Sequence, residues 1–496
     1  MSYQEPEKIV RRTLLASLVV SSVSIACGGS GGAQPSGQAG AGGATGGAGG
    51  ATSGAGGASG GAGGATGGAG GATGGAGGAT GGADAGGADA GGADAGGADA
   101  GDGSPDAPSD SGVSQFGKQI GTDSCVPPGA GYAPAWTMDR RCKARTGQSP
   151  VVSTQTGAVV YSQGVGDGYA SSSFPGETTF AADGTIYANG EVINALDPAT
   201  YATKWKWGSP HFPPVASPNG AVIVMDPTVT PGLVSLNPAT GAVNWSLKFP
   251  KYYVGAATVL ADGSLAFVAG LSELLVLNAA DGSAAWSVDV GPPGKLAQPP
   301  LVVGANGTIY VNMFDKIRAV STATQKISWT APTAVKSSIA LDERDQRLYF
   351  LHLDGGYSKV GSLSATDGTG LAHTSYKFTA GNSTSNLALG ESGWVYFISN
   401  GQLQAINTQT QAHWEHPVTG SCSDPVVGGD GTVYFAETSG SGVAAVAVTA
   451  AGALRWKKVL GPTLDPSSPG SFVTIAPSGH LAITAAANST FYLLGP

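Results

Sequence analysis

Two histidines three residues apart, His413 and His416, form the tightest cluster of potential metal ligands in this 496-residue chain. Imidazole nitrogens bind zinc, but a zinc site needs ligands that converge on one point. We expect the run His413-Trp-Glu-His416 to lie on a β-strand, where residues three apart point to opposite faces. The sequence therefore favours a solvated or packed pair over a metal centre.

Other signatures of catalysis are missing from the sequence. It contains no nucleophile elbow, Walker loop or dinucleotide-binding fingerprint. Four Asp residues recur every five positions at Asp84, Asp89, Asp94 and Asp99 and could chelate a cation, but solvated carboxylates are the simpler interpretation. We therefore expect no catalytic residue, no metal site and no bound cofactor.

The four cysteines fit an exported protein. Cys27 ends an export signal, described below, and Cys125, Cys142 and Cys422 follow it. A disulfide is permitted outside the cytoplasm. We expect Cys125 to pair with Cys142, since the two flank a predicted ring-closing strand, and a Cys142–Cys422 pair stays open as the alternative. Either pairing leaves one thiol.

The elements that would position these side chains come from a repeat with a period near 40 residues. Each copy has a turn, a β-rich run, a second run ending near Asp or Asn, Thr-Gly or a substitute, and an aromatic residue. Seven such aromatic residues lie 38 to 47 positions apart, namely Trp205, Trp245, Trp286, Trp329, Tyr376, Trp414 and Trp456. This period with short strands is typical of a four-stranded propeller blade.

Tight turns recur at the strand starts. Gly supplies a positive φ and Asp or Asn tolerates one, so seven pairs predict hairpins: Asp183-Gly184, Asn219-Gly220, Asp262-Gly263, Asn306-Gly307, Ser392-Gly393, Asp430-Gly431 and Ser478-Gly479. β-formers such as Thr185-Ile-Tyr187 follow these turns, and a helical pattern is nearly absent. The sequence predicts an all-β propeller of four-stranded antiparallel blades.

Four repeats carry a motif close to Ala-x-Asp-x-x-Thr-Gly-x-x-x-Trp. They are Ala195-Leu-Asp197-Pro-Ala-Thr200 with Trp205, Ser235-Leu-Asn237-Pro-Ala-Thr240-Gly241 with Trp245, Ala319-Val-Ser321-Thr-Ala-Thr324 with Trp329, and Ala405-Ile-Asn407-Thr-Gln-Thr410 with Trp414. Tyr201 and Gln325 replace the motif glycine. These copies resemble the PQQ-like, quinoprotein-type β-propeller repeat. The resemblance implies that each aromatic residue packs against the neighbouring blade.

The number of blades follows from the chain ends. Strands near Ser478–Leu494 lack an outer aromatic strand, which Ala135-Trp136-Thr-Met138 could supply. Trp136 would then be the eighth docking aromatic, and an N-terminal strand would close the ring and remove its open sheet edges. A hairpin around Val151–Tyr161 is either an insertion or a degenerate blade, because Trp136 lies far from Trp205. The sequence favours eight blades and leaves seven or nine open.

The N-terminus predicts export and a tether. Lys8, Arg11 and Arg12 precede a short apolar run that ends at Cys27, which resembles a bacterial lipoprotein signal over residues 1–26 with Cys27 as the lipidated residue. Ordinary secretion is the alternative. Residues 27–112, almost entirely Gly, Ala, Thr, Ser and Asp, predict a disordered stalk, and residues 113–496 predict the propeller domain.

Charge excludes one class of partner. The formal net charge is −9, and seven Asp residues of the stalk supply most of it: Asp84, Asp89, Asp94, Asp99, Asp102, Asp106 and Asp110. A nucleic-acid surface would need a clustered basic patch, so we expect no nucleic-acid partner.

The leading functional hypothesis is a membrane-tethered extracytoplasmic lipoprotein whose propeller is a non-catalytic binding or scaffold module. It resembles the BamB-like lipoprotein branch of the family, so it would serve envelope protein assembly or a cell-surface interaction. Its expected partners are the membrane, through Cys27, and a protein or polymer, through the propeller loops. We place it at the outer membrane or cell surface, with a periplasm-facing orientation open.

Two other functions stay open. The family includes quinone-cofactor dehydrogenases, whose resemblance implies acidic and Asn ligands to calcium, an Asp base and adjacent cysteines. This chain has no adjacent cysteines and its repeats are compact. A carbohydrate- or polymer-binding module is the other alternative.

Overall fold

The computed structural model describes most of the chain from residue 115 onward. The described residues are 115–116, 118–119, 125, 142, 144–165, 176–190, 192–208, 213–217, 220–226, 232–248, 253–269, 272–291, 301–313, 315–354, 357–379, 385–463 and 471–496. The expected signal peptide, Cys27, the stalk and Trp136 lie outside the described residues.

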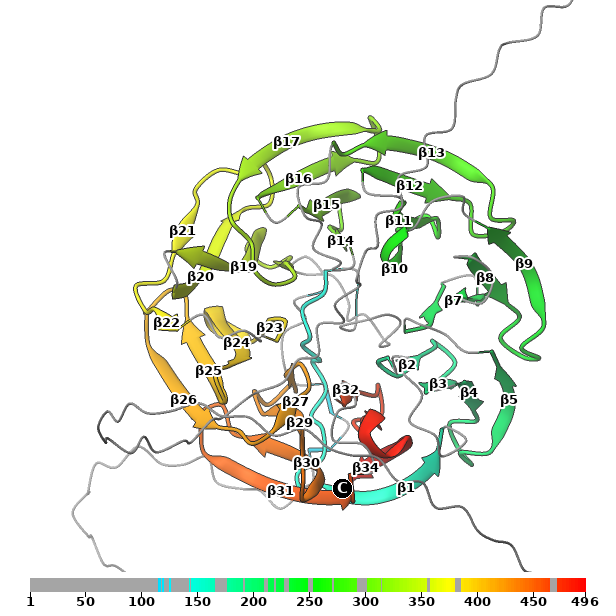
Figure 1. The fold of residues 1–496 in the computed structure, drawn as a ribbon, viewed down its shortest axis with the longest axis vertical. Coiled ribbons are helices and arrows are strands. Elements are labelled where there is room, and N and C mark those ends of the chain that lie inside the picture. The colour runs from blue at the N-terminus through cyan, green and yellow to red at the C-terminus, as the bar shows by residue number, and fades with distance from the viewer. Residues whose placement is uncertain are drawn as a thin grey trace, which may run out of the picture. The chain divides into compact units, whose positions relative to one another are not determined.

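Eight antiparallel sheets follow one another around a ring, which confirms the predicted eight-bladed propeller (Figure 1). We number the blades in chain order. Blades 1 to 4 are β2 (Thr179–Phe180), β3 (Ile186–Asn189), β4 (Ile193–Leu196) and β5 (Thr203–Trp207); β6 (Val215–Ala216), β7 (Val222–Asp226), β8 (Gly232–Leu236) and β9 (Val243–Lys248); β10 (Tyr253–Val259), β11 (Leu265–Ala269), β12 (Glu273–Leu277) and β13 (Ala284–Asp289); and β14 (Val302–Val303), β15 (Thr308–Asn312), β16 (Lys316–Ser321) and β17 (Lys326–Pro332).

The remaining blades contain small variations on the four-stranded plan. Blades 5 to 8 are β18 (Ala340–Asp342), β19 (Arg347–Asp354), β20 (Tyr357–Ser364), β21 (Ala372–His373) and β22 (Phe378–Thr379); β23 (Ala388–Leu389), β24 (Trp394–Ser399), β25 (Gln402–Asn407) and β26 (His413–Pro417); β27 (Ser421–Cys422), β28 (Val426–Val427), β29 (Val433–Ser439), β30 (Gly442–Val448) and β31 (Leu454–Gly461); and β32 (Phe472–Ile475), β33 (Leu481–Ala485), β34 (Thr490–Gly495) and β1 (Ala158–Gly164). The described part of the chain has no α-helix, only two 3-10 turns, η1 (Glu391–Gly393) and η2 (Ala486–Asn488), and hence no helix that could span a membrane.

The ring closes through β1, which pairs antiparallel with the C-terminal strand β34. Closure by an N-terminal strand is confirmed, but the prediction that Ala135–Met138 supplies that strand is wrong. The run Thr156-Gly157-Ala-Val-Val-Tyr161 matches the Thr-Gly-x-x-x-Trp spacing, with Tyr161 in the aromatic position. The segment from Val151 to Tyr161 is therefore neither an insertion nor an extra blade.

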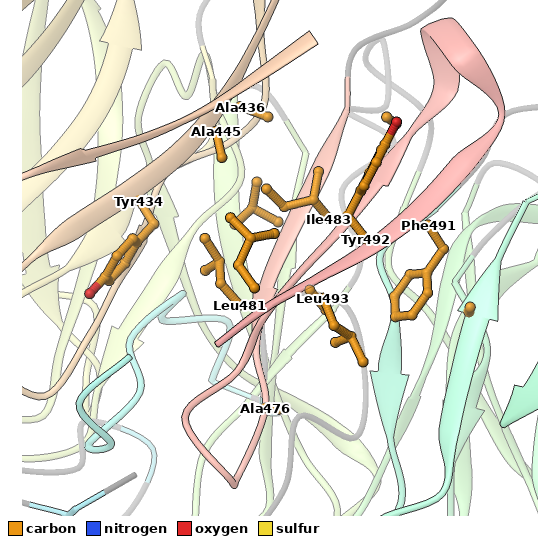
Figure 2. Packing of buried hydrophobic residues seen from close by; sticks show 14 of the residues in the cluster. Tyr434, Ala436, Ala445, Ala476, Leu481, Ile483, Phe491, Tyr492 and Leu493 are labelled. Carbon is orange, nitrogen blue, oxygen red and sulfur yellow. The ribbon is translucent and has the colours of Figure 1, made fainter. Parts of the chain in front are cut away.

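The middle strands of each blade are buried at most positions because neighbouring blades cover both sheet faces. All five residues of β8 and of β11 are buried, whereas the outer strand β9 alternates between exposed and half-buried residues. Seven clusters of buried hydrophobic residues fill the spaces between blades. The cluster in Figure 2 joins blades 7, 8 and 1, with Tyr434, Leu481 and Phe491 among its members.

Candidate functional site

In five blades, the glycine of the turn before the outer strand lies against the aromatic ring of the preceding blade. A Cβ atom added to Gly241 would lie 2.8 Å from the Trp205 ring, so only glycine leaves room for that ring. The indole Nε1 of Trp205 also donates to the carbonyl of Pro238, at 2.8 Å, in the same turn. The same close approach joins Trp245 to Gly282, Trp329 to Gly368, Trp414 to Gly452 and Trp456 to Gly157.

Three blades have a larger residue in place of that glycine. Tyr201, Gln325 and Gln411 have positive φ values of 57°, 55° and 64°, so the turn keeps its left-handed conformation without glycine. At the first of these, Tyr161 packs against Tyr201 with ring centroids 4.9 Å apart, and its hydroxyl donates to the Tyr201 carbonyl at 3.1 Å. Tyr161 therefore makes the inter-blade contact that was expected of Trp136.

A tyrosine on the second strand accompanies the outer tryptophan in four blades. In blade 1, Tyr187 and Trp205 lie opposite the same small residue, Ala195, and their ring centroids are 5.7 Å apart. Corresponding trios are Tyr310, Ala319 and Trp329; Tyr396, Ala405 and Trp414; and Tyr434, Ala447 and Trp456. The motif alanine is small because the two rings meet above it.

Two of these tyrosines make hydrogen bonds beyond their own blade. The Tyr310 hydroxyl donates to the Ala365 carbonyl of blade 5 at 2.9 Å, and the Tyr434 hydroxyl donates to the Thr154 carbonyl, in the segment before β1, at 3.2 Å. Burial raises the pKa of Tyr310 to about 12, with a smaller contribution from the Glu343 carboxylate, which keeps the phenol neutral as a donor. A Thr-x-Tyr run follows three of the predicted turns, at Thr185, Thr308 and Thr432, and signals these tyrosines, but from the sequence we interpreted such runs only as β-forming.

The two histidines first considered as ligands lie on the outer strand β26 and contact different neighbours. His413 stacks on Tyr376 of blade 5, with ring centroids 4.0 Å apart. His416 lies with Nδ1 3.3 Å from the Gly452 carbonyl of blade 7. Among the described residues, no group of three or more His, Cys, Asp or Glu side chains is placed to hold a metal ion.

The middle of the ring is crossed by the chain's own N-terminal segment, residues 144–154, which we call the strap (Figure 1). It runs along the innermost strands of blades 5 to 7, which would otherwise leave an unpaired inner edge. Its backbone bonds are Leu341 N to Ala144 O, Leu389 N to Thr146 O, Val427 N to Gly147 O, Ser149 N to Val427 O and Gly429 N to Val151 O. Every residue from 144 to 154 is buried.

Arg145 extends the strap to the opposite side of the ring. Its side chain is only 1 % exposed, and its guanidinium donates to the Leu301 carbonyl at 3.3 Å and to the Thr258 hydroxyl at 2.9 Å. Those two acceptors belong to the inner parts of blades 4 and 3. Removing this guanidinium would leave the two buried acceptors without their charged hydrogen-bond donor.

A disulfide between Cys125 and Cys142 precedes the strap. Both cysteines are buried in the hydrophobic cluster between blades 4 and 5, and the Thr146 hydroxyl lies 3.3 Å from the Cys125 sulfur. Cys422 is not part of this disulfide and is buried, with its sulfur 3.7 Å from the Gly420 carbonyl.

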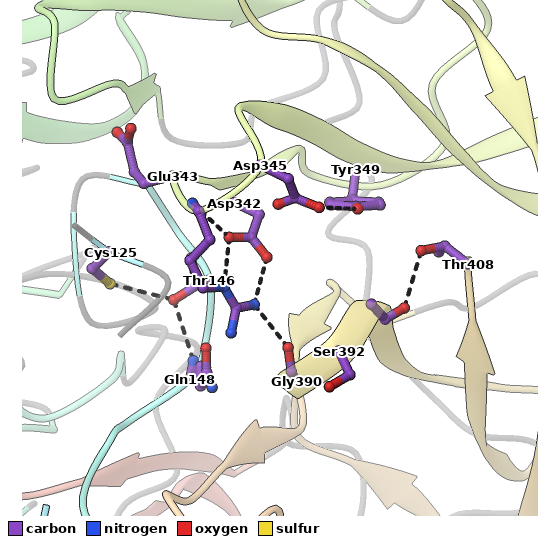
Figure 3. Close-up of polar contacts among 12 residues, drawn as sticks. Cys125, Thr146, Gln148, Asp342, Glu343, Asp345, Tyr349, Gly390, Ser392 and Thr408 are labelled. Atoms are coloured by element: carbon purple, nitrogen blue, oxygen red, sulfur yellow. Dashed lines mark hydrogen bonds and ion pairs between the residues drawn. The ribbon is translucent and has the colours of Figure 1, made fainter. Parts of the chain in front are cut away.

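The first turn of blade 5 carries the most perturbed charged groups near the strap (Figure 3). Arg344 binds both oxygens of Asp342, at 2.8 and 2.5 Å, and donates to the Gly390 carbonyl of blade 6 at 2.8 Å. Burial, and then the Asp342 charge, raise the pKa of Asp345, whose carboxylate accepts from Tyr349 at 3.2 Å. Glu343 accepts from the Ala305 amide of blade 4 at 2.5 Å. This turn therefore joins blades 4, 5 and 6 through hydrogen bonds and an ion pair made by its polar groups.

The described residues do not fit a quinone with a calcium ion. The strap occupies the inner edges of blades 5 to 7, and in the adjacent turn Asp342 binds Arg344 while Glu343 accepts from the Ala305 amide. No nucleophile–base pair lies along it in the described part of the chain. We derive no catalytic step at this site.

Comparison with known proteins matches this geometry to one family. A family model described as outer membrane protein assembly factor BamB matches residues 188–303 and 272–492. The chain belongs to this family of PQQ-like propellers. No curated protein matches the chain.

Solved structures support the propeller architecture of this BamB family member. BamB from Moraxella catarrhalis has a TM-score of 0.51 at 14 % identity, covering 68 % of this chain and 99 % of that one. Quinohemoprotein alcohol dehydrogenase from Comamonas testosteroni has a TM-score of 0.51 at 14 % identity, covering 74 % and 82 %. A europium-containing methanol dehydrogenase has a TM-score of 0.50 at 13 % identity, covering 73 % and 98 %. At such identities the likeness shows the fold alone.

Proposed function

We propose that this chain is an exported, lipid-anchored scaffold of the cell envelope that binds a protein partner through its propeller and carries out no chemistry itself. The observation that carries the proposal is the strap: the inner strands of blades 5 to 7 are bonded to the chain's own buried segment. A ring whose centre is filled this way binds partners with its loops and outer surfaces.

Family membership supports a role in the assembly of outer-membrane proteins, since the matching family is described by that activity. The Gly- and Ala-rich tract at residues 27–112 supports a tether from Cys27, which would raise the concentration of the propeller at the membrane surface. Display at the cell surface is the second location consistent with such a long spacer.

The test is affinity purification of the full chain from its native membranes, with quantitative mass spectrometry of the co-purified proteins. The proposal predicts enrichment of barrel-assembly components relative to a Cys27→Ser chain, which cannot be acylated at that position. Protease treatment of intact cells separates the two locations, because only a displayed propeller is digested. Equal recovery of these components with an unrelated envelope lipoprotein would refute the assembly role.

A further inference from the structure

Basic and exposed aliphatic side chains gather on the outer strands of three consecutive blades, β31, β1 and β5, which follow one another along the rim in Figure 1. These strands contain five basic residues and no Asp or Glu: Lys204, Lys206, Arg455, Lys457 and Lys458. They also hold four strongly exposed aliphatic side chains, Val159, Val160, Leu454 and Val459, with exposed fractions of 39, 46, 52 and 64 %.

Two contacts place these strands side by side. Trp456 of β31 packs on Gly157, which immediately precedes β1. Gln163 of β1 donates to the Thr203 hydroxyl of β5 at 3.3 Å. The surface they form, which we call the basic wall, is therefore continuous from blade 7 to blade 1.

Part of the positive charge on this wall is already neutralised. Arg455 pairs with Asp430 at 2.8 Å, and Lys457 pairs with Glu437. Lys204 donates to the Thr185 hydroxyl at 3.2 Å. Hydrogen bonds from Thr200, with a smaller contribution from the Lys204 charge, lower the pKa of Asp197. Over the residues that the structure describes, no carboxylate pairs with Lys206 or Lys458. The exposed valines lie on β1 and β31, beside these lysine-bearing strands, so the wall offers aliphatic groups and positive charge together.

Basic residues are densest on this arc of the rim. The outer strands of blades 2 and 4, β9 and β17, each have one lysine and no carboxylate, namely Lys248 and Lys326. The outer strand of blade 3, β13, has Asp289 and no basic residue, and that of blade 6, β26, has Glu415 and no Lys or Arg. An outer strand of this fold therefore does not need two or three basic residues. The basic wall needs a specific explanation.

We propose that the basic wall docks on an anionic lipid surface. Protein–protein interfaces are depleted in lysine and enriched in aromatic residues and arginine, whereas this wall contains four lysines and one arginine. Lysines flanking exposed aliphatic groups suit a membrane surface, because the ammonium groups attract lipid phosphates while the aliphatic groups enter the interface. The inference rests on the envelope location in the proposed function, but not on any protein partner.

The test measures co-sedimentation of the Cys27→Ser full chain with vesicles of phosphatidylglycerol mixed with phosphatidylcholine, against phosphatidylcholine alone. We expect binding to the anionic vesicles only. Each surface lysine strengthens such binding by about five-fold, so the double variant Lys206→Ala/Lys458→Ala should bind about 25-fold more weakly. Leu454→Asp should also weaken binding.

The matched control is Val243→Asp on blade 2, because Val243 is 53 % exposed and lies two residues before its blade's tryptophan, as Leu454 does. This control should bind like the parent chain. Absence of binding to anionic vesicles, equal binding to neutral vesicles, or equal loss in the control would each overturn the proposal. None of these results would bear on the recovery of barrel-assembly components, so the two proposals fail separately.

Discussion

The close contact between a turn glycine and the tryptophan ring of the preceding blade can be tested by replacing the glycine with alanine, which adds one methyl group. Gly241→Ala and Gly263→Ala both place alanine in the left-handed region, at φ +70° and +85°, which costs about 1 kcal/mol each. Only the first adds a Cβ atom 2.8 Å from the Trp205 ring, whereas no atom lies within 4 Å of a Cβ on Gly263. Overpacking of this kind costs ~1–3 kcal/mol, so we expect Gly241→Ala to lose about 2 kcal/mol more stability than Gly263→Ala.

Urea denaturation followed by tryptophan fluorescence measures both losses. A double-mutant cycle with Trp205→Ala isolates the contact, because without the ring the Gly241→Ala penalty should fall to that of Gly263→Ala. Equal losses in the two glycine variants, or a penalty that persists without the ring, would refute the account of how blades dock.

Three further predictions concern the strap, the closing strand and the charged turn. Arg145→Met should destabilise the fold by roughly 2 kcal/mol or more, because it leaves buried carbonyl and hydroxyl acceptors without their charged donor, and thermal unfolding would detect this. Tyr161→Ala should cost about 3 kcal/mol by removing the ring that packs on Tyr201 at the closing seam, and it should raise proteolysis near β1 if that seam opens first. The pKa of Asp345 is raised in the folded protein, so its contribution to stability is present below the ordinary Asp pKa and is lost as pH rises through the raised value. Asp345→Asn should therefore stabilise the protein at neutral pH and have no effect on stability in acid. Urea denaturation midpoints measured at both pH values would check this.

Most of the fold could be predicted from the sequence because the repeated turn and outer aromatic residue mark the blade boundaries. Six blades carry an outer tryptophan, and blades 5 and 8 have Tyr376 and Tyr161 instead. The error at Trp136 has a physical reason: Tyr161 fills the docking position with a smaller ring, and its partner Tyr201 replaces the usual glycine. A search for tryptophan therefore placed the closing strand at Trp136 and overlooked β1, whose Thr156-Gly157 turn fits the motif.

The strap could not be predicted from its sequence. Residues 144–154 do not alternate between apolar and polar side chains as a half-buried strand would. Their backbone groups bond to strands far away in the chain rather than to a neighbouring hairpin. Nothing in the sequence around Arg145 indicates that it is buried. Its hydrogen-bond acceptors, Leu301 and Thr258, lie far away in the sequence and come close to it only in the closed ring. The structure has the Cys125–Cys142 disulfide that we expected in preference to Cys142–Cys422. The reason given for it was wrong, because the two cysteines do not flank the strand that closes the ring.

The strap gives the middle of the ring a structural role, and we propose that the protein acts by binding. The most direct measurement is a calorimetric titration of the purified full chain with pyrroloquinoline quinone in the presence of calcium, with alcohol-dependent dye reduction recorded on the same sample. We predict no saturable heat and no dye reduction. Saturable binding accompanied by alcohol-dependent dye reduction would contradict the claim and make the centre of the ring a catalytic site.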